Sequence, residues 1–214
     1  LPRFLTELDA IRDALTLTRL HLFGNSWGGT IAAAYASARP EGLQSLILSS
    51  PLIHPDTWLA DNAAYRAALP PETLATMDRC EAEGRTDAPE YLAAVDVFYI
   101  RHLCRTQPWP EEVLRTFEAM NPDCYAAMWG PNEFTCSGVL RGYDGRAGLA
   151  RITAPTLVTC GEYDEATPTS TARFAAMIAG AQFEMFANAS HMAFIETRAA
   201  YITRLERFLN ARTA

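Results

Sequence analysis

The sequence predicts an α/β fold built on a parallel sheet, because short apolar runs alternate with helical runs along the chain. Four runs have the length and composition of buried strands, at residues 19–23, 44–50, 156–160 and 182–187. Helical runs between them imply right-handed crossovers. Residues 52–142 show little strand character. They therefore predict a helical insertion in a sheet of about four strands.

The first segment, residues 1–51, is predicted to form one half of the sheet core. Leu5 to Leu15 is predicted to be a helix that precedes the strand at 19–23. The alanine-rich run at 27–39 favours a second helix. The next strand, 44–50, ends at Ser49-Ser50-Pro51. This segment thus supplies two strands and the helix that connects them.

The insertion is predicted to be a cap. Its helical runs lie near 55–68, 71–83, 88–106 and 110–128, and prolines at 70, 71, 108 and 110 interrupt them. Since the insertion follows a strand, we expect it to cover the edge where the parallel strands end, which is where ligands bind in open α/β sheets.

Residues 143–214 are predicted to complete the core. The strand at 156–160 is followed by a helix at 170–179, the strand at 182–187 and a final helix at 196–211. Apolar residues recur at helical spacing along that final helix, at Tyr201, Leu205, Phe208 and Leu209. We expect this apolar face to lie against the sheet.

A candidate nucleophile lies between the first strand and the alanine-rich helix. The sequence Gly24-Asn25-Ser26-Trp27-Gly28-Gly29 contains G-x-S-x-G, which in this context is typical of a nucleophile elbow. Gly24 and Gly28 are expected where a Cβ would collide with the neighbouring strand and helix. The hydroxyl of Ser26 should project from a strained turn, near the positive end of the helix dipole.

A serine nucleophile needs a general base, and four histidines are available. His21 lies in the strand that leads to Ser26 and is too close in sequence to fold back on it. His54 follows the second strand and His102 lies in a helical run, whereas His191 occupies a polar loop after the strand at 182–187. Its position after a strand and its place in chain order favour His191.

The loop from Gly161 to Pro168 supplies the candidate acid. It follows the strand at 156–160 and carries three carboxylates. Asp164, three residues past Gly161, is the predicted partner of the histidine, with Glu162 and Glu165 as the alternatives. Nucleophile, acid and base then each follow a separate strand at one edge of the sheet.

The chain resembles the proline iminopeptidase (prolyl aminopeptidase) family of α/β-hydrolases, which includes amino-acid amidase relatives. The matching motifs are Gly-Asn-Ser-Trp-Gly-Gly at 24–29, Gly-Pro-Asn-Glu-Phe at 130–134, Gly-Glu-Tyr-Asp-Glu-Ala-Thr-Pro at 161–168 and Ser-His at 190–191. The resemblance implies an α/β-hydrolase fold with a catalytic triad of Ser26, Asp164 and His191. It also implies that the backbone N–H of Trp27 supplies half of an oxyanion hole.

The same resemblance gives Glu133 a role in substrate binding. A carboxylate in a dry pocket distinguishes a free α-ammonium group from a blocked one, because a neutral amide leaves the buried charge uncompensated. A second such carboxylate is expected from the family, and the sequence does not rank its candidates, which are Glu90, Asp96, Glu111, Glu112 and Glu118.

The chain departs from the family in one respect. Members usually carry a His-Gly-Gly-Pro-Gly loop upstream of the elbow, which supplies the second oxyanion donor, and this sequence contains none. We expect the chain to be the C-terminal portion of a longer hydrolase. The upstream segment should pair alongside Leu20 to Phe23.

Composition narrows the functional classes. The 214 residues are 49% hydrophobic and 20% charged, which suits a globular core, and no apolar run reaches the length of a membrane span. A net charge of −7 argues against nucleic acid. Five dispersed cysteines indicate reduced thiols of a cytoplasmic protein, neither a disulfide framework nor a metal site. No nucleotide-binding motif is present, so no cofactor is expected.

These observations predict a serine exopeptidase that releases an N-terminal residue, proline by resemblance, from short peptides through an acyl-enzyme. The alternatives are an amino-acid amidase or small-ester hydrolase with the same triad, and a non-catalytic ligand receptor with the same fold.

Overall fold

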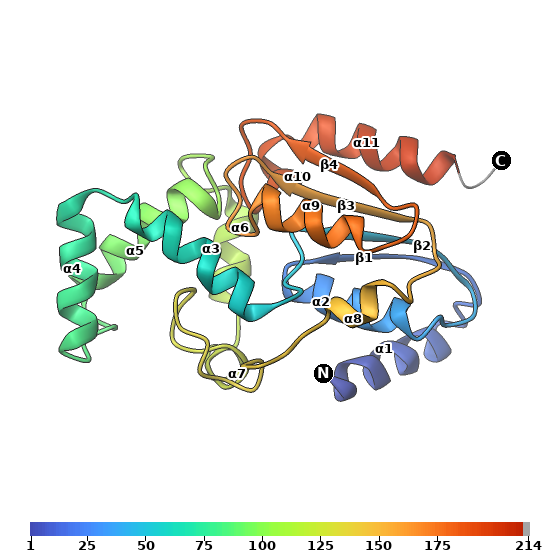
Figure 1. Ribbon diagram of the computed structural model, residues 1–214, viewed down its shortest axis with the longest axis horizontal. Coiled ribbons are helices and arrows are strands. Elements are labelled where there is room, and N and C mark those ends of the chain that lie inside the picture. Colours follow the sequence, from blue (N-terminus) through green and yellow to red (C-terminus); the bar gives the residue numbers. More distant parts are fainter. Residues whose placement is uncertain (212–214) are drawn as a thin grey trace.

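The structure, a computed structural model, describes residues 1–211 and contains one parallel sheet (Figure 1). The strands are β1 (Leu20–Asn25), β2 (Leu43–Ser49), β3 (Thr156–Gly161) and β4 (Gln182–Phe186). They are adjacent in the order β1-β2-β3-β4, and every pair is parallel. The predicted fold class is confirmed, and the strand bounds agree with prediction to within two residues.

The register brings the functional loops to one edge. Asn25 pairs with Ser49, which pairs with Thr159, so the residues that follow β1, β2 and β3 emerge side by side. Gly161 pairs with Phe186 at the end of β4. All six residues of β3 are buried, which makes this strand the centre of the core.

Helices cover both faces of the sheet (Figure 1). Three helices pack on one face, and they are α2 (Trp27–Ser37), α8 (Arg146–Leu149) and α9 (Pro168–Ala176). On the opposite face α11 (Arg198–Asn210) buries Tyr201 and Phe208 against the sheet, as its apolar spacing predicted. Short helix α10 (Ala193–Glu196) precedes it. Helix α1 (Pro2–Ala14) packs beside α2 through Phe4 and Trp27.

Five of the six helices between β2 and β3, here called the cap helices, lie beyond the carboxyl ends of the strands (Figure 1). They are α3 (Pro55–Ala67), α4 (Pro71–Ala82), α5 (Pro89–His102), α6 (Glu111–Glu118) and α7 (Pro122–Met128). Their own core includes Met77, Tyr91 and Phe98. The division into core and cap at residues 52 and 142 stays an interpretation.

Two predicted cap helices were wrong in extent. The run at 110–128 is broken, because Pro122 starts a new helix whose N-cap, Asn121, accepts a hydrogen bond from the Cys124 N–H (2.9 Å). The run at 88–106 ends at His102, since the next residues form hydrogen bonds to the loops beyond β3 and β4 instead of continuing the helix. That early end places His102 beside the candidate site.

Among the described strands, β1 has a neighbour on one side only. Phe23 is 44% exposed on this strand, and α1 beside it contains no buried residue. Ile11 and Leu15 of this region are more than half exposed. Unpaired edge strands with apolar side chains are pairing sites in proteins.

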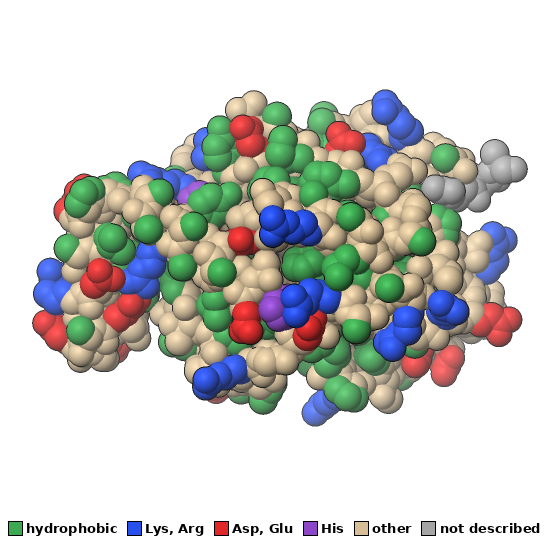
Figure 2. Space-filling model, in the orientation of Figure 1, with side chains coloured by type: hydrophobic (Ala, Val, Ile, Leu, Met, Phe, Trp, Pro, Cys, Tyr) green, Lys and Arg blue, Asp and Glu red, His purple; other side chains and the backbone are tan. Residues whose placement is uncertain are grey.

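The surface carries both signs of charge. Figure 2 shows acidic and basic side chains interspersed over the cap helices and over the helices of the sheet. Across residues 1–211, no helix is long and apolar enough to cross a membrane.

Candidate active site

Ser26 occupies the turn between β1 and α2 with φ 52° and ψ −120°. A non-glycine residue at positive φ is strained, and such strain at a site is typical of functional turns. The turn is held by the backbone, because the Ser26 N–H donates to Ser49 O (3.0 Å) and its carbonyl accepts from the N–H groups of Gly29 and Leu52. The half-buried Ser26 therefore lies where β1 ends, in the geometry expected of a nucleophile elbow.

The glycines of the elbow have unequal roles. A Cβ on Gly24 would lie 2.2 Å from the carbonyl oxygen of Gly28 and 2.8 Å from Cβ of Ala32. A Cβ on Gly29 would lie 2.7 Å from Pro51. The expectation for Gly28 was wrong, since a Cβ there meets no atom within 4 Å in the described residues. Neighbouring atoms thus leave no room for a side chain at positions 24 and 29, and only glycine fits there.

This asymmetry predicts different stabilities for two substitutions. Gly24→Ala should destabilise by about 1–3 kcal/mol or more, because backbone atoms must move to admit the methyl group. Gly28→Ala should be neutral or stabilising by up to about 1 kcal/mol, because alanine restricts the unfolded chain and lies in a helix. Urea unfolding of both variants measures the difference. Equal losses would show that the elbow tolerates no side chain at either position.

Asp164 and His191 are in direct contact. His191 Nδ1 lies 2.8 Å from Asp164 Oδ1, and both side chains are buried. Asp164 also accepts from the Ser50 hydroxyl (2.5 Å) and from the N–H groups of Gly161 and Ala166. Because an ionised carboxylate only accepts, Nδ1 of His191 carries the proton and Nε2 is left as the base.

The two alternative acids lie elsewhere. Glu162 accepts a hydrogen bond from the N–H of Asn188 and does not contact His191. Glu165 approaches His191 Nδ1 only to 3.7 Å. Of the three loop carboxylates, Asp164 has the geometry of the acid.

The hydrogen bond that would connect the serine nucleophile to the histidine is not formed in this structure. Within residues 1–211, no hydrogen bond joins the Ser26 hydroxyl to His191. Catalytic hydrogen bonds are often loose without substrate and tighten in the complex. The structure therefore brings together Asp164 and His191, and places Ser26 at the same edge without a bond to them.

Glu133 lies in a loop after α7 that is held by hydrogen bonds of Asn132. The side chain of Asn132 accepts from the Phe134 N–H and donates to Tyr91, and its carbonyl accepts from the indole of Trp129. Glu133 is half-buried and accepts a 2.5 Å hydrogen bond from the Tyr125 hydroxyl. Burial raises the pKa of Glu133 above its ordinary value, and the hydrogen bond from Tyr125 and the nearby His191 oppose that rise.

Glu165 is a buried carboxylate that the sequence suggested only as an alternative acid. Its side chain is 2% exposed, and its Oε2 has no hydrogen-bond partner among the described residues. Burial raises the pKa of Glu165 well above its ordinary value, and the negative charges of Glu133 and Asp164 raise it further. A buried carboxylate of this kind needs a proton or a cation.

The five carboxylates considered for the second ammonium contact are all exposed; they are Glu90, Asp96, Glu111, Glu112 and Glu118. Glu90, for example, forms an exposed ion pair with Arg85. The sequence contained one indication that Glu165 belongs to the site. It lies next to Asp164 in the loop that follows a strand.

Aromatic rings line the space between cap and core. Trp58 of α3 packs its ring edge-to-face on His191, with centroids 5.7 Å apart, and also contacts Trp129. The indole N–H of Trp58 is buried, and it has no partner atom in the part of the chain that the structure describes. The Trp58 side chain nevertheless interacts with the Glu133 carboxylate and opposes the rise in its pKa, so this donor belongs to the surroundings of Glu133.

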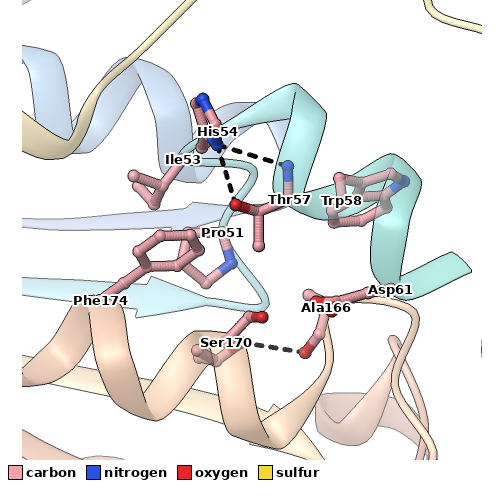
Figure 3. A pocket seen from close by; sticks show the side chains of 10 residues that line it. Pro51, Ile53, His54, Thr57, Trp58, Asp61, Ala166, Ser170 and Phe174 are labelled. Carbon is pink, nitrogen blue, oxygen red and sulfur yellow. Dashed lines mark hydrogen bonds between the residues drawn. The ribbon is translucent and has the colours of Figure 1, made fainter.

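A small cavity lies beside this region (Figure 3). It is lined by the β2–α3 loop and the start of α3 on one side, and by Ser170 and Phe174 of α9 on the other. His54 hydrogen bonds to Thr57 at its rim. None of Ser26, Asp164, His191 and Glu133 lines this cavity. The buried groups described above, and not this cavity, therefore form the candidate substrate site.

Comparison with known proteins agrees with this arrangement. Residues 2–204 match the model of the alpha/beta hydrolase family. The chain is 39% identical to a proline iminopeptidase of Heyndrickxia coagulans, over 99% of this chain and 74% of that protein. It is 38% identical to one of Lactobacillus acidophilus, over 96% of this chain and 70% of that protein.

Two solved structures have the same fold. The proline iminopeptidase of Mycobacterium smegmatis superposes with a TM-score of 0.91 at 36% identity, covering 98% of this chain and 71% of that one. VinJ superposes with a TM-score of 0.94 at 35% identity, covering 98% and 72%. The fold and site define an α/β-hydrolase. The chain belongs to the proline iminopeptidase family of these enzymes, which supports a prolyl aminopeptidase-like hydrolase.

Proposed function

We propose that this protein is a serine exopeptidase that releases an N-terminal residue, with proline preferred, from short peptides. The observation that carries the proposal is the buried carboxylate of Glu165. Its Oε2 has no partner in the described residues, and the negative charge of Glu133 acts on it beside the Asp164–His191 pair. Two neighbouring carboxylates, one of them fully buried, are suited to a cationic ligand, such as the primary or secondary ammonium group of a free N-terminus.

In this proposal Ser26 attacks the scissile carbonyl while His191 Nε2 accepts the hydroxyl proton. His191 then donates that proton to the leaving amine, and Asp164 holds the imidazole tautomer and stabilises the imidazolium. The N–H of Trp27, at the start of α2, binds the oxyanion together with a second donor. Water attacks the acyl-enzyme by the same route and releases the amino acid.

Glu133 and Glu165 would fix the substrate by its charged N-terminus. Binding of a cation lowers the pKa of both carboxyl groups, so that both become ionised in the complex. A peptide with a blocked N-terminus supplies no charge and leaves the carboxylates uncompensated. The position of the two carboxylates would thus limit cleavage to the first residue.

The function is tested with proline, alanine and leucine arylamides and with N-acetyl-proline arylamide, using the full-length protein. We expect turnover of the proline compound to exceed the others and the acetylated compound to be inert. Equal rates on all free amino acids indicate a broad amidase. Turnover of simple esters alone indicates an esterase, and no labelling of Ser26 by a fluorophosphonate indicates a non-catalytic receptor.

Glu133→Gln should lower kcat/KM on proline arylamide by about 10–100-fold, because one ammonium contact becomes neutral. Hydrolysis of an acetate ester, which lacks the amine, should change by less than about threefold, because Ser26 and His191 are untouched. Glu118→Gln, an exposed change in α6, is the matched control. Parallel losses on both substrates would assign Glu133 to the structure of the pocket.

We also propose that an upstream segment of the same hydrolase pairs with β1. This proposal is supported by the free edge of β1 among the described strands, and by the exposed side chains of Phe23, of Ile11 in α1 and of Leu15 just after α1. The chain spans 70–74% of the length of two curated relatives. Such a segment could also carry the second oxyanion donor.

Intact mass and gel analysis of the active preparation test this pairing. We expect an additional polypeptide or a longer chain, and loss of activity when the 214 residues are produced alone. A single monomeric species of 23.6 kDa that hydrolyses proline arylamide would contradict it.

A further inference from the structure

The end of α5 contacts both loops that carry the candidate acid and base. The carbonyl oxygen of His102 accepts hydrogen bonds from the N–H of Glu165 (3.3 Å) and the N–H of His191 (3.2 Å). One residue further, the carbonyl of Leu103 accepts from the Met192 N–H (3.1 Å). The acid loop and the histidine loop thus meet at one peptide of the cap.

The side chain of His102 adds a third bond to the same loops. Its Nδ1 lies 2.8 Å from the carbonyl oxygen of Tyr163. A carbonyl oxygen only accepts, so Nδ1 carries the proton and donates. His102 therefore forms hydrogen bonds to His191, the candidate base, and to Tyr163 and Glu165, the two neighbours of Asp164 in the chain.

Packing fixes the orientation of the His102 ring. It stacks on Tyr65 of α3 with centroids 4.0 Å apart and planes 14° apart, and it contacts Phe98 at 4.8 Å. The residue is 8% exposed. Burial lowers the pKa of His102, which keeps the ring neutral and the Nδ1 tautomer fixed.

Other contacts hold the same two loops to the cap. Asn62 of α3 donates from its side chain to Glu165 O (3.3 Å). The Glu196 carboxylate accepts from the N–H of Arg105 (2.6 Å) and from Ser190, next to His191. Of His102, Asn62 and Glu196, only His102 forms hydrogen bonds to both the acid loop and the histidine loop.

We propose that His102 is a positioning residue for the reaction, setting the distance between the Asp164 loop and the His191 loop. This inference rests on the proposed serine mechanism, because it concerns the geometry of the Asp164–His191 pair. The cap thereby has a part in the alignment of the base as well as in substrate binding. A displacement of about 1 Å in such a pair costs on the order of 10²-fold in rate.

The experiment compares two amide substitutions at this position. In His102→Asn the side-chain N–H lies at the place of Nδ1 and can still donate to Tyr163 O. In His102→Gln the amide lies one carbon further, near the place of Nε2, and cannot. Tyr65→Leu is the matched control, because it removes the stacking partner of His102 but none of its hydrogen bonds.

We expect His102→Gln to lower kcat on proline arylamide by about 10–100-fold, with KM changed by less than about threefold. The rate of Ser26 labelling by a fluorophosphonate should fall in parallel. The downfield proton resonance of His191 Nδ1–H should shift or broaden. His102→Asn should restore all three to within about threefold of the parent protein. Tyr65→Leu should lower the melting temperature but keep kcat within about threefold, because the hydrogen bond to Tyr163 O still orients the His102 ring.

Equal defects in the Asn and Gln variants, a loss confined to KM, or an unchanged His191 resonance in His102→Gln would overturn the proposal. Labelling and the proton resonance require no peptide substrate. If the parent protein turns over no arylamide, the proposed function fails, while these two measurements still decide the role of His102.

Discussion

Asp164→Asn is expected to lower kcat on proline arylamide by about 10⁴-fold, the size of the loss when the acid of a serine triad loses its charge. Asp164 Oδ1 contacts His191 Nδ1 at 2.8 Å, and its Oδ2 contacts the Ser50 hydroxyl. An asparagine that keeps its oxygen toward His191 places its NH2 group where Asp164 Oδ2 accepts from Ser50 and Gly161. The Ser50 hydroxyl can rotate to accept from this group, whereas the Gly161 N–H loses its acceptor. The imidazolium that forms during attack then lacks its counter-charge.

The loss should be the same for peptide and ester substrates, because both need the base. Glu162→Gln is the matched control in the same loop, since Glu162 contacts the backbone of Asn188 and not His191. Steady-state kcat on both substrates and the melting temperature of each variant are the measurements. A large loss in Glu162→Gln, or a small one in Asp164→Asn, would reassign the acid.

The sequence was sufficient for the sheet and for the elbow because both depend on local patterns. Apolar runs of strand length have few alternatives in a chain of this composition, and their alternation with helical runs predicted that the strands are parallel. Ser26 and His191 were predicted as site residues from their places after strands, and Asp164 from its distance from Gly161. These are statements about neighbours along the chain.

The predictions that were wrong or missing depend on neighbours in space. Gly28 was expected to be sterically required by its motif, but α2 and β1 leave its Cβ position open. Glu165 was considered as an acid, and its burial beside Glu133 comes from the packing of α3 and the loop after α7 over the strand ends. His102 was set aside as a helical residue, and its hydrogen bonds to the acid and histidine loops span 61 residues or more along the chain. Burial and such long-range contacts have no local signature.

Glu165→Gln is expected to separate substrate recognition from chemistry. Activity on proline arylamide should fall by about 100-fold, because the ammonium group loses a buried ionic partner. Activity on an acetate ester should stay within about threefold, in contrast to Asp164→Asn. A matching loss on the ester would mean that Glu165 acts on His191, whose Nδ1 lies 3.7 Å away, and not on the substrate.

The same substitution should stabilise the protein as the pH rises. The folded-state pKa of Glu165 is raised by burial and by Glu133 and Asp164, so between its unfolded and folded values the native state holds a proton that the unfolded state has lost. Unfolding stability of the parent therefore falls as pH increases through that window. Glutamine has no proton to lose, and Glu165→Gln should gain stability relative to the parent from the unfolded pKa of about 4.3 upward. Urea unfolding of both proteins from pH 4 to pH 9 measures this difference. A difference that stays constant across the range would show that Glu165 is ionised in the free enzyme, and that substrate binding releases no proton from it.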